Sequence, residues 1–271
     1  YWLLLKTAYQ FKLKHNLKKL LRLTLIAFLI WYAFVLPKNL FNTTYSTVVL
    51  DKTGGLLGAH IAMDEQWRFP KPDSLPLDYI NALLTYEDQQ FFQHPGVNPI
   101  SLFQALIENI QSGRIKRGGS TITMQVIRMS RGNPSRTIPE KLYEILLATR
   151  LELSLTKDEI LLEYAAHAPY GGNVVGIEAA CCRYFGRPLH QLSKAEYAML
   201  AVLPNNPALI HLGRNRNALK TKRNLLLYDL WLNGILNENE NDLAQAEELP
   251  LKPVNMPSSA VHLSALLNQT K

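Results

Sequence analysis

The chain has 271 residues, of which 47% are apolar, so it can form one large hydrophobic core or two small ones. Of its 29 basic residues, seven precede the first acidic residue, Asp51, and the remaining 22 balance the 22 acidic ones. The formal net charge of +7 therefore belongs to an N-terminal arm on a neutral body, which argues against a nucleic-acid partner.

The basic arm leads into residues 23–36, which carry no charge. We predict a cytoplasmic segment at residues 1–22 and one transmembrane helix at residues 23–37, because Lys and Arg concentrate on the cytoplasmic side. A signal-peptide core is the first alternative, but no small-residue cleavage site follows. An amphipathic helix lying on the membrane is the second, but the segment is apolar all round.

The rest of the chain predicts a mainly α domain over residues 38–245. Two short strands, residues 46–50 and 56–62, flank turn residues and predict a β-hairpin. Helices are predicted at about residues 99–112, 121–129, 139–153 and 218–233, the second of them capped by Ser120, and two more follow capping boxes at residues 156–159 and 193–196. Cys181 and Cys182 are adjacent, so they fit two small apolar side chains in a helix better than a disulfide.

Glu87 is the most informative residue. Ile80, Leu83 and Leu84 precede it at helical spacing, which places its carboxylate on the apolar stripe of its own helix. Burial there raises the pKa of a carboxyl group toward a value useful for proton transfer near neutral pH. The alternative is an acid at the end of a helix that pairs with a nearby Arg.

An anion site is predicted at Gly118-Gly119-Ser120-Thr121, immediately before a helix. Backbone N–H groups and the helix dipole favour negative charge there. Basic side chains surround the segment, namely Arg114, Lys116, Arg117 and Arg128, and would suit a phosphate or diphosphate. A plain turn is the alternative.

Glu144 also lies on the apolar stripe of its predicted helix. The alternative is a solvated acid that pairs with Lys141 or Arg150.

Three segments together resemble the peptidoglycan glycosyltransferases of family 51, the glycosyltransferase domain of class A penicillin-binding proteins. The residues that carry the resemblance are Glu87, Asp88, Phe91, His94 and Gly96 in the first motif, residues 118–125 in the second, and Lys141 and Glu144 in the third. Residues 67–70 and 168–173 resemble the C subtype.

The resemblance implies a lysozyme-like, mainly helical domain that polymerises lipid II into glycan strands at the outer face of the cytoplasmic membrane. Glu87 matches the general base, and Glu144 matches a second essential acid that supports the leaving diphosphate through a divalent metal such as Mg²⁺ or Mn²⁺. Substrate contacts are implied for the remaining motif residues, namely Asp88, Phe91, His94, Gly96, Arg117, Ser120, Thr121, Gln125, Arg128, Lys141 and Arg223. The implied partners are lipid II, the growing glycan strand, the membrane and other cell-wall synthesis proteins, and residues 246–271 would lead to a transpeptidase domain.

Several positions depart from the family pattern. Met124 stands where the family often has Gln, and Glu140 stands where it usually has a positive residue. In the fourth motif, Glu163 comes one place late and Ala166 replaces Asn. One step along a helix turns a side chain by about 100°, so Glu163 should not simply replace the missing acid of this motif. A lipid II-binding or scaffold module with weakened catalysis is therefore the alternative function, and a lysozyme-like hydrolase is a further one.

Overall fold

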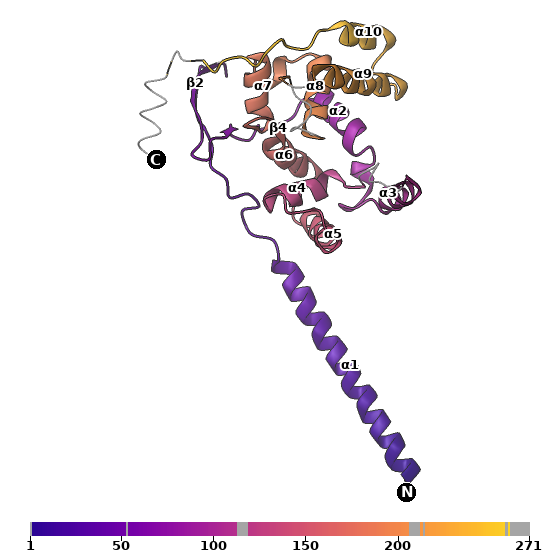
Figure 1. Ribbon diagram of the computed structural model, residues 1–271. Coiled ribbons are helices and arrows are strands. Elements are labelled where there is room, and N and C mark those ends of the chain that lie inside the picture. Colours follow the sequence, from indigo (N-terminus) through magenta and orange to yellow (C-terminus); the bar gives the residue numbers. More distant parts are fainter. Residues whose placement is uncertain are drawn as a thin grey trace. The chain divides into compact units, whose positions relative to one another are not determined.

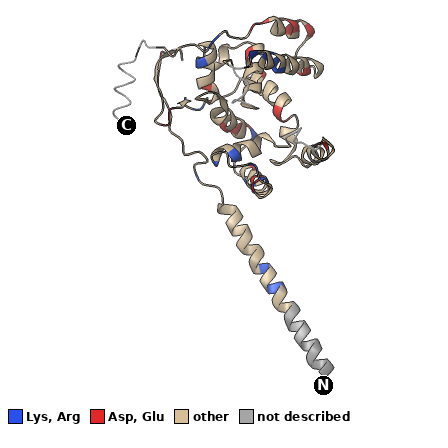
Figure 2. Ribbon diagram, viewed as in Figure 1, with Lys and Arg blue, Asp and Glu red and all other residues tan. Residues whose placement is uncertain are grey.

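The computed structural model describes residues 2–52, 54–112, 119–205, 212–213, 215–257 and 260, which form two compact units, Tyr1–Phe41 and Asn42–Lys271 (Figure 1). The first unit is built on helix α1, Trp2–Phe34. Its large apolar side chains between Leu17 and Phe34 are exposed. Figure 2 shows the described basic residues of α1, which all precede its uncharged residues 23–34. Within the described residues, no helix has the combination of length and apolar content needed to cross a membrane.

Two small sheets belong to the second unit. Strands β1 (Thr47–Leu50) and β2 (Leu56–His60) form the predicted antiparallel hairpin, with Thr47 opposite His60. Strand β5 (Val174–Val175) pairs in parallel with β3 (Trp67–Arg68) and antiparallel with β4 (Pro169–Gly171). The sequence did not predict this second sheet, because strands of two or three residues are too short to show alternation.

Helices form most of the second unit, which confirms the mainly α prediction. They are α2 (Leu77–Glu87), α3 (Pro99–Ser112), α4 (Ile122–Ser130), α5 (Ile138–Glu152), α6 (Lys157–His167), α7 (Ile177–Phe185), α8 (Lys194–Val202), α9 (Arg216–Leu232) and α10 (Glu238–Ala246), with 3-10 turns η1 (Phe91–Gln93), η2 (Leu189–Gln191) and η3 (Leu203–Asn205). Residues 195–202 of α8 are all buried, and α8 packs against α2 and α9. Helix α4 packs against α5 and α6. These two groups of helices hold the ends of α2 and α4, where the predicted motifs lie.

Helix caps follow the sequence closely. Both predicted capping boxes are present, at the starts of α6 and α8. At α4 the prediction was wrong by one residue: the hydroxyl of Thr121, not of Ser120, accepts the backbone N–H of Met124, at 3.2 Å. The hydroxyl of Ser120 is thereby left for other partners. Cys181 is buried and Cys182 half-buried on α7, and both are free thiols.

The beginning of the predicted linker packs against the domain. Helix α10 ends at Ala246, close to the predicted boundary. Leu249 is buried, and the guanidinium of Arg216 donates to its carbonyl oxygen at 3.1 Å. The backbone N–H of Val254 donates to the carbonyl of Arg183 at 2.7 Å. These contacts attach residues 249–254 to α9 and α7.

Candidate active site

A cleft of about 1130 Å³ lies in the second unit, where the C-terminal end of α2 faces the N-terminal end of α4. It is lined by Thr85, Tyr86, Glu87, Asp88, Gln89, Gln90, Asn98, Ile100, Ser101, Gln104, Gly119, Ser120, Thr121, Gln125, Arg128, Met129, Asn133, Arg136, Tyr164, Pro169, Pro204 and Asn205. Six of the predicted site residues are in this lining, and they come from segments separated by more than thirty positions in the sequence. The cleft therefore brings the first and second motifs together.

Glu87 is the last residue of α2 and lies on the wall of the cleft. Its Oε2 accepts a hydrogen bond of 2.8 Å from Nε2 of Gln125, whereas its buried Oε1 has no hydrogen-bond partner. Burial raises the pKa of Glu87, the charge of Asp88 raises it further, and the amides of Gln125 and Asn205 oppose both effects. The predicted direction of the shift is confirmed, and Oε1 is left without a hydrogen-bond donor.

Three cations gather on the α4 and α5 side of the site. Nζ of Lys141 contacts the hydroxyl of Ser120 and lies 3.5 Å from Oε2 of Glu144. Burial lowers the pKa of Lys141, the guanidinium groups of Arg128 and Arg136 lower it further, and Glu144 raises it. Neither Lys141 nor Glu144 is in the cleft lining, and Glu144 is only 4% exposed, so the pair reaches the cleft through the contact of Lys141 with Ser120, which does line it.

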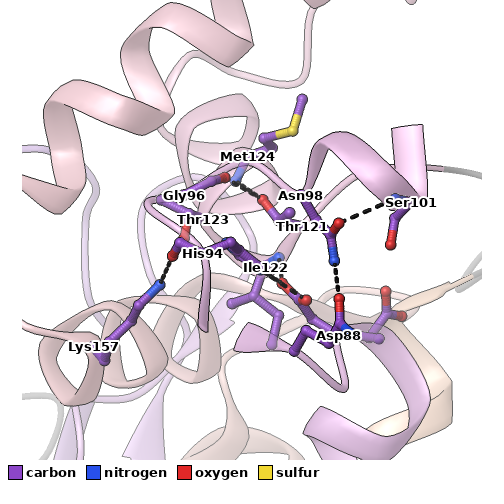
Figure 3. Close-up of polar contacts among 12 residues, drawn as sticks. Asp88, His94, Gly96, Asn98, Ser101, Thr121, Ile122, Thr123, Met124 and Lys157 are labelled. Atoms are coloured by element: carbon purple, nitrogen blue, oxygen red, sulfur yellow. Dashed lines mark hydrogen bonds and ion pairs between the residues drawn. The ribbon is translucent and has the colours of Figure 1, made fainter. Parts of the chain in front are cut away.

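Asp88, which lines the cleft, forms a buried pair with His94, which does not (Figure 3). Nε2 of His94 lies 3.0 and 3.1 Å from the two carboxylate oxygens of Asp88, and Oδ2 also accepts the backbone N–H of Ile122 at 3.1 Å. A carboxylate at the first N–H groups of a helix satisfies an unpaired donor and complements the helix dipole. The pair therefore ties the end of α2 to the start of α4.

Gly96 completes this attachment. Its carbonyl accepts a hydrogen bond of 2.6 Å from the hydroxyl of Thr121, and its φ of +85° lies in the left-handed region. A Cβ at this position would lie 2.7 Å from the carbonyl oxygen of Ala148 on α5. Only glycine allows the loop to approach α5 this closely.

Lys157 is a half-buried link to which the sequence pointed only through its place in a capping box. Its Nζ donates to the carbonyl of His94 and to Oε1 of Glu152, both at 2.8 Å, and lies 4.3 Å from the ring centre of Phe91. Glu152 in turn accepts a hydrogen bond from Thr123 at 2.6 Å. The first turn of α6 thus holds the loop after α2 against α4 and α5.

The sequence model of the transglycosylase family matches residues 55–230, which include the cleft. The chain belongs to the transglycosylase family. It is 35% identical over 232 residues to penicillin-binding protein 1C of Escherichia coli (strain K12), a match that covers 85% of this chain and 30% of that protein. It is 39% identical over 175 residues to penicillin-binding protein 1A of Pseudomonas aeruginosa, covering 65% of this chain and 21% of that protein.

A shorter relative matches along its whole length. The chain is 33% identical over 231 residues to a putative transglycosylase of Cupriavidus necator, and the match covers 79% of this chain and 100% of that protein. The chain spans less than a third of the two penicillin-binding proteins above. The resemblance to family 51 of the glycosyltransferases and to class A penicillin-binding proteins is therefore confirmed.

Not every predicted site residue of the transglycosylase lines the cleft. Phe91, His94 and Gly96 belong to the support behind its wall. Arg223 is 1% exposed, and its guanidinium donates to the carbonyl oxygens of Glu247 and Gln245 and to its neighbour Asn224. Arg117 lies outside the described residues.

Some residues of the transglycosylase cleft had no place in the sequence prediction. Arg136 lines the cleft between α4 and α5, and Asn205 lines it from η3. Arg136 stands just before Thr137, the cap of α5, so a basic residue next to a helix start was the available signal. Asn205 had no signal in the sequence, because its position depends on how η3 packs against β4.

The described residues of the transglycosylase do not form a metal site on their own. Within the part of the chain that the structure describes, no group of three or more His, Cys, Asp or Glu side chains could hold a metal ion. Glu144 provides one carboxylate, which already pairs with Lys141, and Arg128 lies within its electrostatic reach. Divalent cations such as Mg²⁺ require several oxygen ligands. The metal implied by the resemblance stays a prediction.

Proposed function

We propose that this transglycosylase is a peptidoglycan glycosyltransferase that polymerises lipid II into glycan strands, with inversion and release of polyprenyl diphosphate. One observation carries the proposal: Glu87, an acid whose pKa burial raises, shares a cleft with a helix start and a group of cations. Glycosyl transfer from a diphosphate donor requires a base and positive charge for the leaving group.

Glu87 acts as the general base. Its carboxylate takes the proton of the acceptor sugar's 4-hydroxyl while that oxygen forms a bond to the anomeric carbon of the donor. The bond between the anomeric carbon and the diphosphate oxygen breaks at the same time, and its electron pair leaves with the diphosphate. Oε1 is the oxygen suited to the proton, because Gln125 already occupies Oε2.

The leaving diphosphate is stabilised by Lys141, Arg128, Arg136 and the N-terminal turn of α4. Positive charges that are already in place at the site where negative charge develops need little reorganisation during the reaction. Glu144 contributes through Lys141, because its carboxylate pairs with the ammonium group. The two guanidinium groups nearby favour loss of the ammonium proton, and Glu144 opposes that loss.

A binding module with weakened catalysis remains the second candidate function, on the evidence of the altered fourth motif. Glu163, the acid of that motif, pairs with Lys71 at 2.9 Å and also lies near His167. It is not in the cleft lining. If the family requires an acid at this position, the cleft holds substrate but turns it over slowly.

We further propose that the catalytic domain has the lysozyme-like fold of its family and lies at the outer face of the bacterial cytoplasmic membrane, anchored by residues 23–37. The exposed apolar side chains of α1 and the basic residues on its N-terminal side support an anchor. Lipid II is itself embedded in a membrane, so an anchor keeps enzyme and substrate together. Other cell-wall synthesis proteins and a transpeptidase domain after residue 271 are proposed from the class A relatives.

The decisive experiment is a lipid II polymerisation assay on the purified chain in detergent, with glycan products separated by size. Wild type is expected to produce glycan polymer, and Glu87→Gln is expected to reduce the rate by at least about 100-fold, as loss of a general base does. Glu238→Gln removes an exposed carboxylate on α10 and should polymerise at the wild-type rate.

Two other results would change the conclusion. Binding of lipid II by wild type without any polymer would favour the binding module. Polymerisation by Glu87→Gln at the wild-type rate would show that another group takes the proton.

A further inference from the structure

Lys222, the residue before Arg223 on α9, contacts two residues of the cleft lining. Its Nζ lies 3.2 Å from Oδ1 of Asn205 and 3.4 Å from the hydroxyl of Tyr86. Both partners line the cleft, and Tyr86 directly precedes Glu87. One step along the helix turns the side chain by about 100°, so Lys222 contacts residues of the cleft lining while Arg223 contacts the carbonyls of Gln245 and Glu247 at the end of α10.

We propose that Lys222 is a positioning residue for Glu87, acting through Asn205 and Tyr86 and through its own charge. This inference rests on the proposed function of Glu87 as a general base. It assigns a role to a side chain whose two polar partners both flank that base.

The contact with Lys222 orients the side-chain amide of Asn205. An ammonium group has only donors, so the atom of Asn205 that faces it must be Oδ1. The NH₂ end of the amide is then directed away from Lys222 and is free to favour the carboxylate of Glu87. Without Lys222 the amide can rotate and present its carbonyl oxygen to the carboxylate, which repels it.

The charge of Lys222 also acts on Glu87 directly. Other groups face this carboxylate: Asp88 at the end of α2, Tyr79 and Tyr86 within α2, Tyr164 on α6, Gln125 on α4, and Asn205. Among the groups that shift the pKa of Glu87, Lys222 is the positive charge and Asp88 the negative one. Lys222 therefore opposes the upward shift that burial and Asp88 produce.

The test is the pH dependence of kcat/KM for lipid II polymerisation. The proton of Glu87 is bound more tightly once the ammonium is removed, so Lys222→Met should move the acidic limb of the profile to higher pH. A shift of about half a pH unit to one unit is expected for one charge near a partly solvated site. Lys222→Arg keeps the charge and should restore most of the wild-type limb.

Lys220→Met is the matched control on the same helix. Lys220 pairs with Glu248 at 2.6 Å, away from the cleft, so its loss should leave the acidic limb in place. An acidic limb of Lys222→Met that coincides with wild type, whatever happens to kcat, would overturn the proposal. If Lys222→Met fails to fold, Asn205→Leu carries the same expectation, because it removes the amide that Lys222 orients.

A second readout does not depend on catalysis. In protein labelled with ¹³C at the glutamate carboxyl groups, the signal of Glu87 is the one lost in Glu87→Gln. Its titration midpoint should rise in Lys222→Met and stay unchanged in Lys220→Met. A wild type that makes no polymer would contradict the proposed function, whereas an unchanged midpoint in Lys222→Met would contradict the role of Lys222.

Discussion

At the scale of single residues, two ionisable groups of the site have pKa values shifted from their ordinary values. Burial raises the pKa of Glu87 and lowers that of Lys141. Both shifts have the same physical cause, the loss of water around a charged group. The acid becomes a better proton acceptor near neutral pH, while the lysine depends on Glu144 to keep its proton beside Arg128 and Arg136.

Replacing Glu144 tests this dependence. In Glu144→Gln the carboxylate that raises the pKa of Lys141 is lost, so Lys141 should lose its proton at lower pH. The alkaline limb of the profile of kcat/KM against pH is therefore expected to move to lower pH.

The control for this prediction is Glu140→Gln on the first turn of α5, where the acid pairs with Arg131 instead. It should leave the alkaline limb in place. An alkaline limb that is the same in wild type and Glu144→Gln would show that Glu144 does not act through Lys141.

At the scale of elements, the loop after α2 is held by contacts to three helices. Asp88 bonds to the start of α4, Gly96 approaches α5, and Lys157 of α6 donates to the carbonyl of His94. The resemblance attributed substrate contacts to Phe91, His94 and Gly96. Their burial instead supports a role in fixing the positions of Glu87 and of the first turn of α4.

Gly96→Ala tests the close approach of this loop to α5. It forces a left-handed φ on a residue with a Cβ and places that Cβ 2.7 Å from the carbonyl oxygen of Ala148. A decrease of about 3 kcal/mol in the free energy of unfolding is expected, measured by urea denaturation.

Gly132→Ala is the matched control, because Gly132 also has a left-handed φ, +73°, but a Cβ there would meet no atom within 4 Å. It should cost only the backbone strain, about 1 kcal/mol. Equal losses in the two variants would mean that the contact with α5 contributes nothing.

At the scale of the whole molecule, the two compact units have different surfaces. The first unit exposes large apolar side chains between Leu17 and Phe34, which is unfavourable in water. The second unit buries its apolar side chains between helices and opens a polar cleft. The proposed membrane anchor would cover the exposed apolar side chains of the first unit.

Vesicle flotation tests the anchor. The whole chain reconstituted in lipid vesicles should float with them and resist both high salt and alkaline carbonate, because a buried apolar helix is held by the hydrophobic effect. A chain that begins at Asn42 should be largely released. Release of the whole chain by high salt alone would indicate electrostatic attachment of the basic arm and would contradict a transmembrane helix.

The sequence by itself determined most of the helices, two of their capping boxes and the burial of Glu87. Apolar spacing before Glu87 and the capping boxes of α6 and α8 depend on neighbours within a few positions, and such local patterns can be read along the chain. The order of the motifs was sufficient to identify the family, because several separate segments agreed.

Only the tertiary structure decided which polar side chains reach the cleft. Arg223 and Lys222 are adjacent in sequence, yet the packing of α9 against α8 and α10 turns one into the protein and the other toward Glu87. Likewise, Glu144 contacts Lys141 rather than the cleft, and Asn205 reaches it from a distant 3-10 turn. The direction of a polar side chain at a helix surface depends on contacts between segments far apart in the chain, which periodicity does not contain.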